Sequence, residues 1–264
     1  MDNPTSYAAL FTTAIQMTYC LAMQLNSGLV FCSDSRTNAG ADQVSTYGKM
    51  HVFSDFPDRT LVILSAGNLA TSQAVLSQIR RDISDAAPSN LSSFAYLSEV
   101  ADYIGELCLK TQEKYAPAGQ SAGFSPEASF IVGGQIDAQA PSIHMIYPEG
   151  NHITASRHHP YLQIGEVKYG KPILERIVRG NTDYKTAMRC ALVSMNSTMH
   201  SNATVGPPIE LLYYTSGEPG SVTHRVMFDE NDGYLRSLGD AWDVKIVEAF
   251  NDLPSIAPFL QKLN

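Results

Sequence analysis

The sequence predicts an α+β fold in which two antiparallel sheets stack face to face and a layer of helices covers each outer side. Three observations lead to this four-layer αββα sandwich. Strand-like runs follow one another without intervening helices, helical runs come in pairs between groups of strands, and neither a repeat nor a linker divides the 264 residues. Consecutive strands favour antiparallel pairing, and helices grouped in this way favour outer layers.

The first group of strands begins after residue 17. Apolar runs at 18–25 and 28–35 are separated by Asn26-Ser27, which is a hairpin signal. Two further runs, at 45–53 and 59–67, are joined by a short segment that contains a proline. We therefore expect four strands in succession.

The next segment spaces its apolar residues three or four apart, which is typical of amphipathic helices. This spacing predicts one helix over residues 69–83. A second helix is expected to begin after Asn90, a good capping residue, and to run to Cys108. Residues 116–126 are rich in Gly, Ser and Pro, so they predict a loop.

The second half of the chain repeats this order of strands followed by helices. Strands are predicted at 128–137, 142–147 and 161–166, and helices at 170–179 and 183–199, the latter capped by Thr182 or Asp183. Strands at 209–215 and 222–228 precede a C-terminal helix around Trp242. We expect residues 18–264 to form one domain, and residues 1–17 to be a leader or a misassigned start.

Composition and charge exclude several classes of function. The chain has 18 basic and 26 acidic side chains, a net charge of −8, so it lacks the basic surface of a nucleic-acid-binding protein. It contains no apolar run of membrane-spanning length, and no Lys or Arg precedes Arg36 to form a targeting signal. Four scattered cysteines indicate reduced thiols, and the adjacent His158-His159 pair does not resemble a metal site. We expect a cytoplasmic protein without membrane contact, cofactor or metal.

Asp34 gives the first indication of chemistry. It shares a strand face with Val30 and Cys32, which are expected to be buried, and a buried carboxylate is costly unless it is paired. Arg36 and Lys49 are the candidate partners. An ion pair at a strand end explains these residues without any catalytic role, so the pattern alone leaves both interpretations open.

Thr18 strengthens the catalytic interpretation. It begins the first strand and follows Met17, whose removal would leave Thr18 with a free α-amine. Such an amine titrates near neutrality and is able to take the proton of the threonine hydroxyl. A nearby lysine would hold the amine neutral, and an aspartate would orient the lysine. Thr18, Lys49 and Asp34 supply these three parts.

The residues also resemble a known family. The segment from Thr18 to Arg36, followed by Lys49 and Ser65-Ala66-Gly67, resembles the N-terminal half of proteasome β-type subunits. Within that superfamily, segments 33–40 and 48–53 are most similar to Anbu, the bacterial ancestral-β-subunit branch. The resemblance implies the sandwich of N-terminal-nucleophile hydrolases and a threonine-type peptidase that assembles into homo-oligomers.

The resemblance also implies a role for each matching residue. Thr18 corresponds to the nucleophile and, through its own amine, to the base. Lys49 corresponds to the cation that lowers the pKa of that amine, and Asp34 to the partner of the lysine. Gly67 matches the glycine whose N–H forms the oxyanion hole, and Arg36 would organise the surrounding residues.

Two parts of the family pattern differ in this sequence. Residues 165–170 stand where proteasomal subunits carry a serine in a glycine-rich turn. Ser201, Asn202 and Thr204 stand where the family has an aspartate and a serine. Ser201 or Asn202 is expected to hydrogen-bond the N-terminus, but neither brings the negative charge. The sequence therefore predicts that the acid next to the α-amine is missing.

Three functions remain in consideration. The leading one is cleavage of peptide or unfolded-protein substrates inside a self-assembled oligomer, with the helices at 69–83 and 91–108 as lateral contacts. The alternatives are an amidase for small amides and a catalytically silent assembly subunit that retains residues 1–17. The sequence leaves open the cleavage preference, the ring or helical form of the assembly, and any regulatory ATPase.

Overall fold

The computed structural model describes residues 18–38, 44–122, 124–218, 222 and 224–260. The strands are β1 (Tyr19–Leu25), β2 (Gly28–Ser33), β3 (Arg36–Asn38), β4 (Val44–Thr46), β5 (Met50–Phe53), β6 (Arg59–Gly67), β7 (Ala128–Ile136), β8 (Ser142–Ile146), β9 (His152–Thr154), β10 (Tyr161–Gly165), β11 (Ile209–Thr215) and β12 (His224–Phe228). The helices are α1 (Leu69–Ser84), α2 (Leu97–Ala122), α3 (Lys171–Ile177), α4 (Tyr184–Ser201), α5 (Gly233–Asn251) and α6 (Ala257–Leu260).

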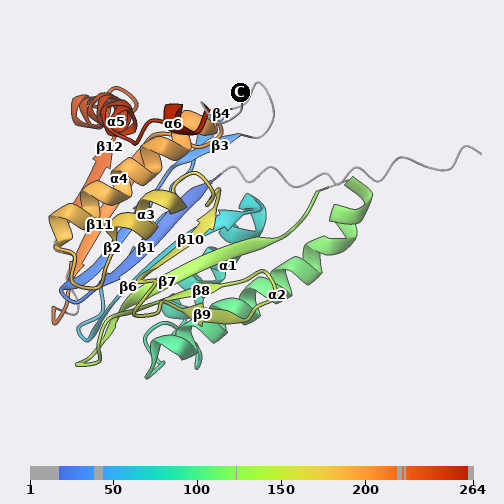
Figure 1. Ribbon diagram of the computed structural model, residues 1–264. Helices are drawn as coiled ribbons and strands as arrows, with labels where there is room; N and C mark the ends of the chain where they lie inside the picture. The colour runs from blue at the N-terminus through green and yellow to red at the C-terminus, as the bar shows by residue number, and fades with distance from the viewer. Residues whose placement is uncertain (1–17, 39–43, 123, 219–221, 223, 261–264) are drawn as a thin grey trace, which may run out of the picture.

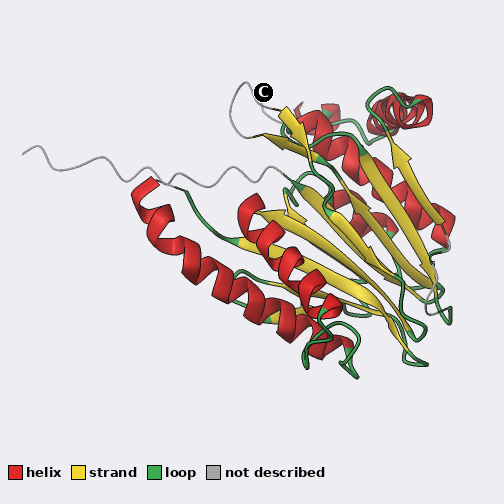
Figure 2. Ribbon diagram, turned by 180° about the vertical axis from the view of Figure 1, so that it is seen from behind, coloured by secondary structure: helices red, strands yellow, loops and turns green. Residues whose placement is uncertain are grey.

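These elements form two antiparallel sheets of five strands that lie face to face (Figures 1 and 2). The first sheet has the order β10-β1-β2-β11-β12 and the second the order β5-β6-β7-β8-β9, while β3 and β4 form a separate pair. Helices α3 and α4 cover the outer face of the first sheet, and α1 and α2 cover that of the second (Figures 1 and 2). The predicted αββα sandwich is confirmed.

Strand β1 lies inside the first sheet and is buried on both faces. Tyr19 and Leu21 face the helices, whereas Cys20 and Ala22 pack between the two sheets. A slip of one residue would exchange these two sets of side chains, so the two distinct cores fix the register of β1. This register places Thr18 at the edge of the sandwich.

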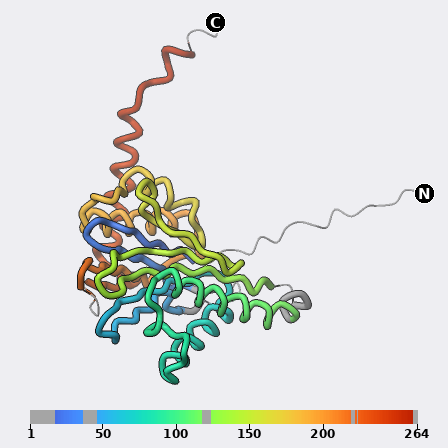
Figure 3. The backbone as a smooth tube through the Cα atoms, turned by 90° about the horizontal axis from the view of Figure 1, so that it is seen from below, coloured from blue at the N-terminus to red at the C-terminus, as the bar shows by residue number. Residues whose placement is uncertain are grey.

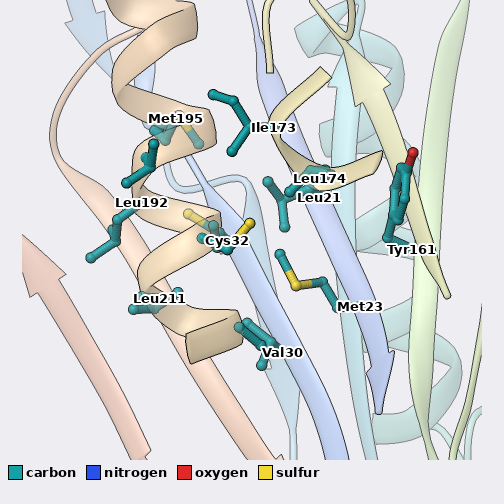
Figure 4. Close-up of a cluster of buried hydrophobic side chains, with 14 of the residues drawn as sticks. Leu21, Met23, Val30, Cys32, Tyr161, Ile173, Leu174, Leu192, Met195 and Leu211 are labelled. Atoms are coloured by element: carbon teal, nitrogen blue, oxygen red, sulfur yellow. The ribbon is translucent and has the colours of Figure 1, made fainter. Parts of the chain in front are cut away.

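Figure 4 shows the core between the first sheet and its helices. Leu21 of β1 and Cys32 of β2 lie opposite Leu192 and Met195 of α4, together with Leu174 of α3. All five side chains are at most 2% exposed. Burial of such side chains contributes roughly 1.5–3 kcal/mol each, so this layer holds α4 firmly against the strands.

The second sheet carries α1 and α2 in the same way. Leu61 and Ile63 of β6 pack against Val75 and Ile79 of α1, in one cluster with residues of α2. Helix α1 begins directly after Asn68, whose side chain accepts a hydrogen bond from the N–H of Thr71 at 3.1 Å. Because β6 ends at Gly67, this cap places the first turn of α1 beside the end of the strand.

Two expectations about α2 are wrong. Asn90 does not begin the helix: its side chain accepts from the N–H of Ser92 at 2.7 Å and closes a separate turn, and α2 begins at Leu97. The predicted loop at 116–126 is helical as far as Ala122. Alanines alternate with the Gly, Ser and Pro residues of this segment, and their helix propensity outweighs the loop signal.

The predicted strand at 45–53 is interrupted. Its first part, β4, pairs with β3, whereas β5 pairs with β6 in the second sheet. The interruption at 47–49 contains Lys49, which the two pairings bring to the edge of the sandwich. Strand β9 was not predicted, because its three residues are too few to show an alternating pattern.

Helix α5 extends away from the body of the sandwich (Figure 3). It begins after Asp232, whose side chain caps its first turn, and it includes Trp242 as predicted. Large apolar residues beyond Trp242 are exposed, including Val244, Val247 and Phe250 at 56%, 58% and 70%. None of the helices in the described part of the chain is long and apolar enough to cross a membrane.

Candidate active site

Four strand ends bring the predicted site residues to one edge of the sandwich. Thr18 directly precedes β1, Asp34 follows β2, Lys49 precedes β5, and Gly67 ends β6. β1 and β2 are antiparallel, with Cys20 opposite Ser33, so the start of one strand meets the end of the other. The structure thus brings together residues that are up to 49 positions apart in the sequence.

Asp34 and Lys49 form a buried ion pair. Lys49 Nζ donates to Asp34 Oδ1 at 2.8 Å, and the two side chains are 7% and 0% exposed, lysine first. Lys49 Nζ also donates to the carbonyl of Arg36 at 2.7 Å. The backbone N–H groups of Tyr19 and Gly206 donate to the carboxylate at 3.0 and 3.3 Å.

These contacts act against the cost of burying Asp34. Burial raises the pKa of Asp34 above its ordinary value, whereas the ammonium of Lys49 and the two backbone donors lower it. The sequence offered Arg36 and Lys49 as partners, and the structure selects Lys49. Four hydrogen bonds hold this buried pair, and they fix the position of the lysine.

Thr18 is 6% exposed, and its carbonyl accepts from the N–H of Glu166 at 2.7 Å. Gly165, the last residue of β10, has a φ of +84°, and a Cβ there would lie 2.0 Å from the carbonyl oxygen of Thr18. Only glycine permits this approach. The backbone of Thr18 is therefore held from two sides.

Thr18, Lys49 and Gly67 line one cleft of about 710 Å³. Its walls are the segment from Tyr47 to Lys49, the end of β6, and the first three turns of α1. Gly67 has a φ of +97°, and a Cβ there would lie 2.5 Å from the carbonyl oxygen of Glu127. The positive φ and the close neighbour both require glycine at this position.

Arg36 supports the pair indirectly. Its Nη1 donates to the carbonyl of Ala203 at 2.9 Å, and its Nη2 lies 3.5 Å from the exposed carboxylate of Glu230. The guanidinium also packs against Gly206, where a Cβ would lie 2.3 Å from Cζ. Because Gly206 donates to Asp34, Arg36 positions the loop that completes the carboxylate's hydrogen bonds.

The structure places Ser201, Asn202 and Thr204 at the end of α4 and in the segment that follows it. Ser201 is exposed at the end of α4. The side chain of Asn202 donates to Glu166 Oε2 at 3.0 Å and accepts from Thr204 Oγ1 at 2.6 Å. Among the described contacts, Asn202 therefore binds both Glu166 and Thr204.

Glu166 is the residue that the sequence did not reveal. Its backbone N–H binds the carbonyl of Thr18, and its carboxylate lies 3.3 Å from Nζ of Lys168 and hydrogen-bonds Asn202. The side chain is 12% exposed. The structure thus places an acidic residue from the end of β10 against the backbone of Thr18. Its place at the end of the predicted strand 161–166 was the only signal in the sequence.

The four cysteines are free and buried, as expected for structural thiols. Burial raises the pKa of Cys190 to about 12 and that of Cys108 to about 11, so both are poor nucleophiles at neutral pH. No group of three or more His, Cys, Asp or Glu residues suited to a metal occurs in the described part of the chain. The cysteines therefore offer no nucleophile, whereas the cleft is lined by the hydroxyl-bearing residue Thr18.

Solved structures resemble this chain over most of its length. Anbu (ancestral β-subunit) from Yersinia bercovieri is 39% identical, with a TM-score of 0.82, over 90% of this chain and 99% of the other. The helical assembly of the Anbu complex from Pseudomonas aeruginosa is 40% identical, with a TM-score of 0.82, over 90% of this chain and 98% of the other. Anbu from Hyphomicrobium sp. strain MC1 is 37% identical, with a TM-score of 0.80, over 90% of this chain and 99% of the other. No family model and no curated protein matches the sequence.

The two stacked antiparallel sheets and their outer helices define a proteasome-like fold of the N-terminal-nucleophile hydrolase class. Identity of 39–40% over nine-tenths of the chain shows the family as well as the fold. The chain belongs to the Anbu family.

Proposed function

We propose that this protein is a threonine-type peptidase whose mature chain begins at Thr18. The observation that carries the proposal is the buried Asp34–Lys49 pair in the wall of the cleft that Thr18 lines. A buried ion pair is costly to maintain, because both charges lose their hydration. Next to a threonine hydroxyl it has a clear chemical use.

The reaction follows from the groups in the cleft. Thr18 Oγ attacks the carbonyl carbon of the substrate amide, and its proton passes to the α-amine of Thr18. The resulting oxyanion accepts a hydrogen bond from the N–H of Gly67, which contributes roughly 3 kcal/mol. The protonated amine then gives its proton to the leaving amine, and the C–N bond breaks. An ester between the acyl group and Thr18 Oγ remains.

Water completes the cycle. The neutral α-amine takes a proton from water as the water oxygen attacks the ester carbonyl, and the same proton returns to Thr18 Oγ as the ester bond breaks. The ammonium of Lys49 favours the neutral amine and stabilises the developing alkoxide. Asp34 keeps the lysine in place.

Glu166 supplies the negative charge in this proposal. Its backbone N–H fixes the Thr18 carbonyl, and we assign to its carboxylate the role of the negative charge that acts on the α-amine. Asn202 holds this carboxylate. The carboxylate raises the pKa of the α-amine and the lysine lowers it, so together they hold this pKa near neutral pH.

We also propose that the protein works as a homo-oligomer in the cytoplasm. The Pseudomonas aeruginosa relative was solved as a helical assembly. In this chain, α5 and α6 expose large apolar side chains, at 70% for both Phe250 and Phe259. A patch of this kind supports a protein contact, so we propose the C-terminal helices as a contact surface in addition to α1 and α2. Four unpaired cysteines are consistent with a reducing compartment.

Replacement of the nucleophile tests the proposed activity. In Thr18→Ala, hydrolysis of a fluorogenic peptide panel and labelling by a threonine-directed β-lactone should both fall to background, because the attacking oxygen is gone. Thr18→Ser keeps a hydroxyl and is expected to retain labelling. Peptide hydrolysis by Thr18→Ala at the wild-type rate would refute the assignment. Cleavage of small amides but not of peptides would indicate an amidase instead.

A further inference from the structure

The cleft contains basic side chains that the proposed reaction does not use. Besides Lys49, it is lined by His51 of β5 and Arg80 of α1. Of the described residues that line the cleft, none is an aspartate or glutamate. The cleft therefore carries unbalanced positive charge beyond the catalytic lysine.

Arg80 has no carboxylate partner among the described residues. Its printed contact is Nη2 to Nδ1 of His51 at 3.3 Å. A guanidinium only donates, so Nδ1 must accept and the proton of the neutral ring lies on Nε2. Burial, with the positive charges of Arg80 and Arg225, lowers the pKa of His51 to about 4. His51 is therefore neutral near pH 7 and does not compete with Arg80 for an anion.

The other charged groups near His51 do not balance Arg80. Arg225 is paired with Glu210 at 2.7 Å. Glu210 is only 3% exposed, and its carboxylate lies 3.6 Å from the place of a Cβ on Gly48. The negative charge of Glu210 is thus already balanced by Arg225 and does not balance Arg80. The buried Nε2 of His51 has no hydrogen-bond partner among the described residues, so this wall also lacks an acceptor.

The position of this pair relative to Thr18 suggests which part of a substrate meets it. His51 follows Lys49 by two residues, and Met50 between them packs between the sheets. Side chains alternate along a strand, so His51 and Lys49 leave the backbone on the same side, about 7 Å apart. The residue whose carbonyl is attacked would extend its side chain from Thr18 past Lys49 towards His51 and Arg80.

We propose that Arg80, backed by His51, forms a subsite for an acidic side chain at the residue that supplies the scissile carbonyl. The proposal rests on Thr18 being the nucleophile, because Thr18 fixes where that carbonyl lies. The carboxylate of a glutamate side chain would accept two hydrogen bonds from the guanidinium. Basic side chains at the same position meet like charge. The substrate class is therefore peptides cleaved after an acidic residue.

A binding measurement separates this subsite from catalysis. The full-length Thr18→Ala protein is titrated with a product-like peptide that ends in glutamate and with its glutamine counterpart, by calorimetry. The glutamate peptide should bind about fivefold more tightly, the factor that a partly exposed ion pair provides. Arg80→Met should remove this difference. Arg81→Met is the matched control, because Arg81 is the next residue of α1 and does not line this cleft.

Each outcome decides one question. Equal binding of the two peptides by the Thr18→Ala protein, no measurable binding, or a preference that survives Arg80→Met would overturn the subsite. A preference lost in Arg80→Met but kept in Arg81→Met supports it, even if the wild type hydrolyses no peptide, in which case only the peptidase proposal fails. If the wild type is active, Arg80→Met should lower kcat/KM about fivefold for a glutamate substrate and leave a leucine substrate unchanged.

Discussion

The edge of the sandwich at Thr18 and the C-terminal helix α5 depart from ordinary protein surfaces in opposite ways. At the first, Asp34 and Lys49 bury two charges. At the second, Val247 and Phe250 expose large apolar surfaces. Both features are unfavourable in an isolated chain, since buried charges lose hydration and exposed apolar groups order water. The comparison separates two tasks, because the buried charges suit chemistry on a substrate and the exposed helix suits contact with another protein.

The largest effect is expected at the buried pair. Lys49→Met should lower peptide hydrolysis by about a hundredfold or more, because it removes the cation beside the nucleophile. It should also lower the free energy of unfolding by about 3–5 kcal/mol, because Asp34 is left buried and unpaired. Urea denaturation and a peptide assay measure the two effects.

A double variant separates stability from chemistry at the same pair. Asp34→Asn combined with Lys49→Met removes both charges, so it should recover much of the lost stability while hydrolysis stays low. Lys168→Met, at an exposed lysine near the site, is the control and should change the free energy of unfolding by less than about 0.5 kcal/mol. A fully active Lys49→Met would contradict the catalytic role.

The opposite behaviour is expected at α5. Phe250→Asp should dissociate the oligomer at micromolar concentration, as measured by sedimentation velocity, because it places a charge in the apolar patch. The stability of the subunit itself should change by less than about 0.5 kcal/mol, since Phe250 is 70% exposed. Leu235→Ala, at a buried position of the same helix, should instead cost about 2–5 kcal/mol. An unchanged sedimentation profile for Phe250→Asp would assign assembly to another surface.

A smaller effect is expected at Glu166. A carboxylate near the α-amine of Thr18 favours the charged amine, so Glu166→Gln should lower the pKa of that amine. The amine would then become neutral at lower pH, and the acidic limb of the pH–rate profile should move down by about half a unit. Glu175→Gln, at an exposed glutamate of α3, should leave the profile unchanged. A profile that moves upwards would count against the proposed charge.

The main features of the fold were predictable because most strands and helices show a local pattern of apolar residues. Short apolar runs predicted β1, β2 and β6, and three- to four-residue spacing predicted α1 and α4. Where the local signal was composition alone, the prediction failed: the Gly, Ser and Pro residues at 116–122 are part of α2. The cap assigned to Asn90 failed because the same side-chain chemistry also closes turns.

The site was predictable to the extent that its residues end strands. Asp34 stood out as a carboxylate at the end of a buried strand, and Thr18 as the first residue of a strand after Met17, whereas Gly67 was implied by the resemblance to proteasome β-type subunits. Glu166 also ends a predicted strand, but nothing in the sequence linked that strand to Thr18, and Arg80 gave no signal of this kind. Each reaches the site only because two segments distant in sequence pack side by side, β10 on β1 and α1 beside β5.

The state of the N-terminus tests the central claim most directly, because Thr18 has an α-amine only when the bond to Met17 is absent. The measurement is the intact mass of the protein purified from its native host, followed by the mass after treatment with a β-lactone. The account predicts a chain that begins at Thr18 and gains one lactone adduct, located on Thr18 by peptide mapping. A chain that retains all of residues 1–17 and takes up no adduct would contradict it and would identify a catalytically silent assembly subunit.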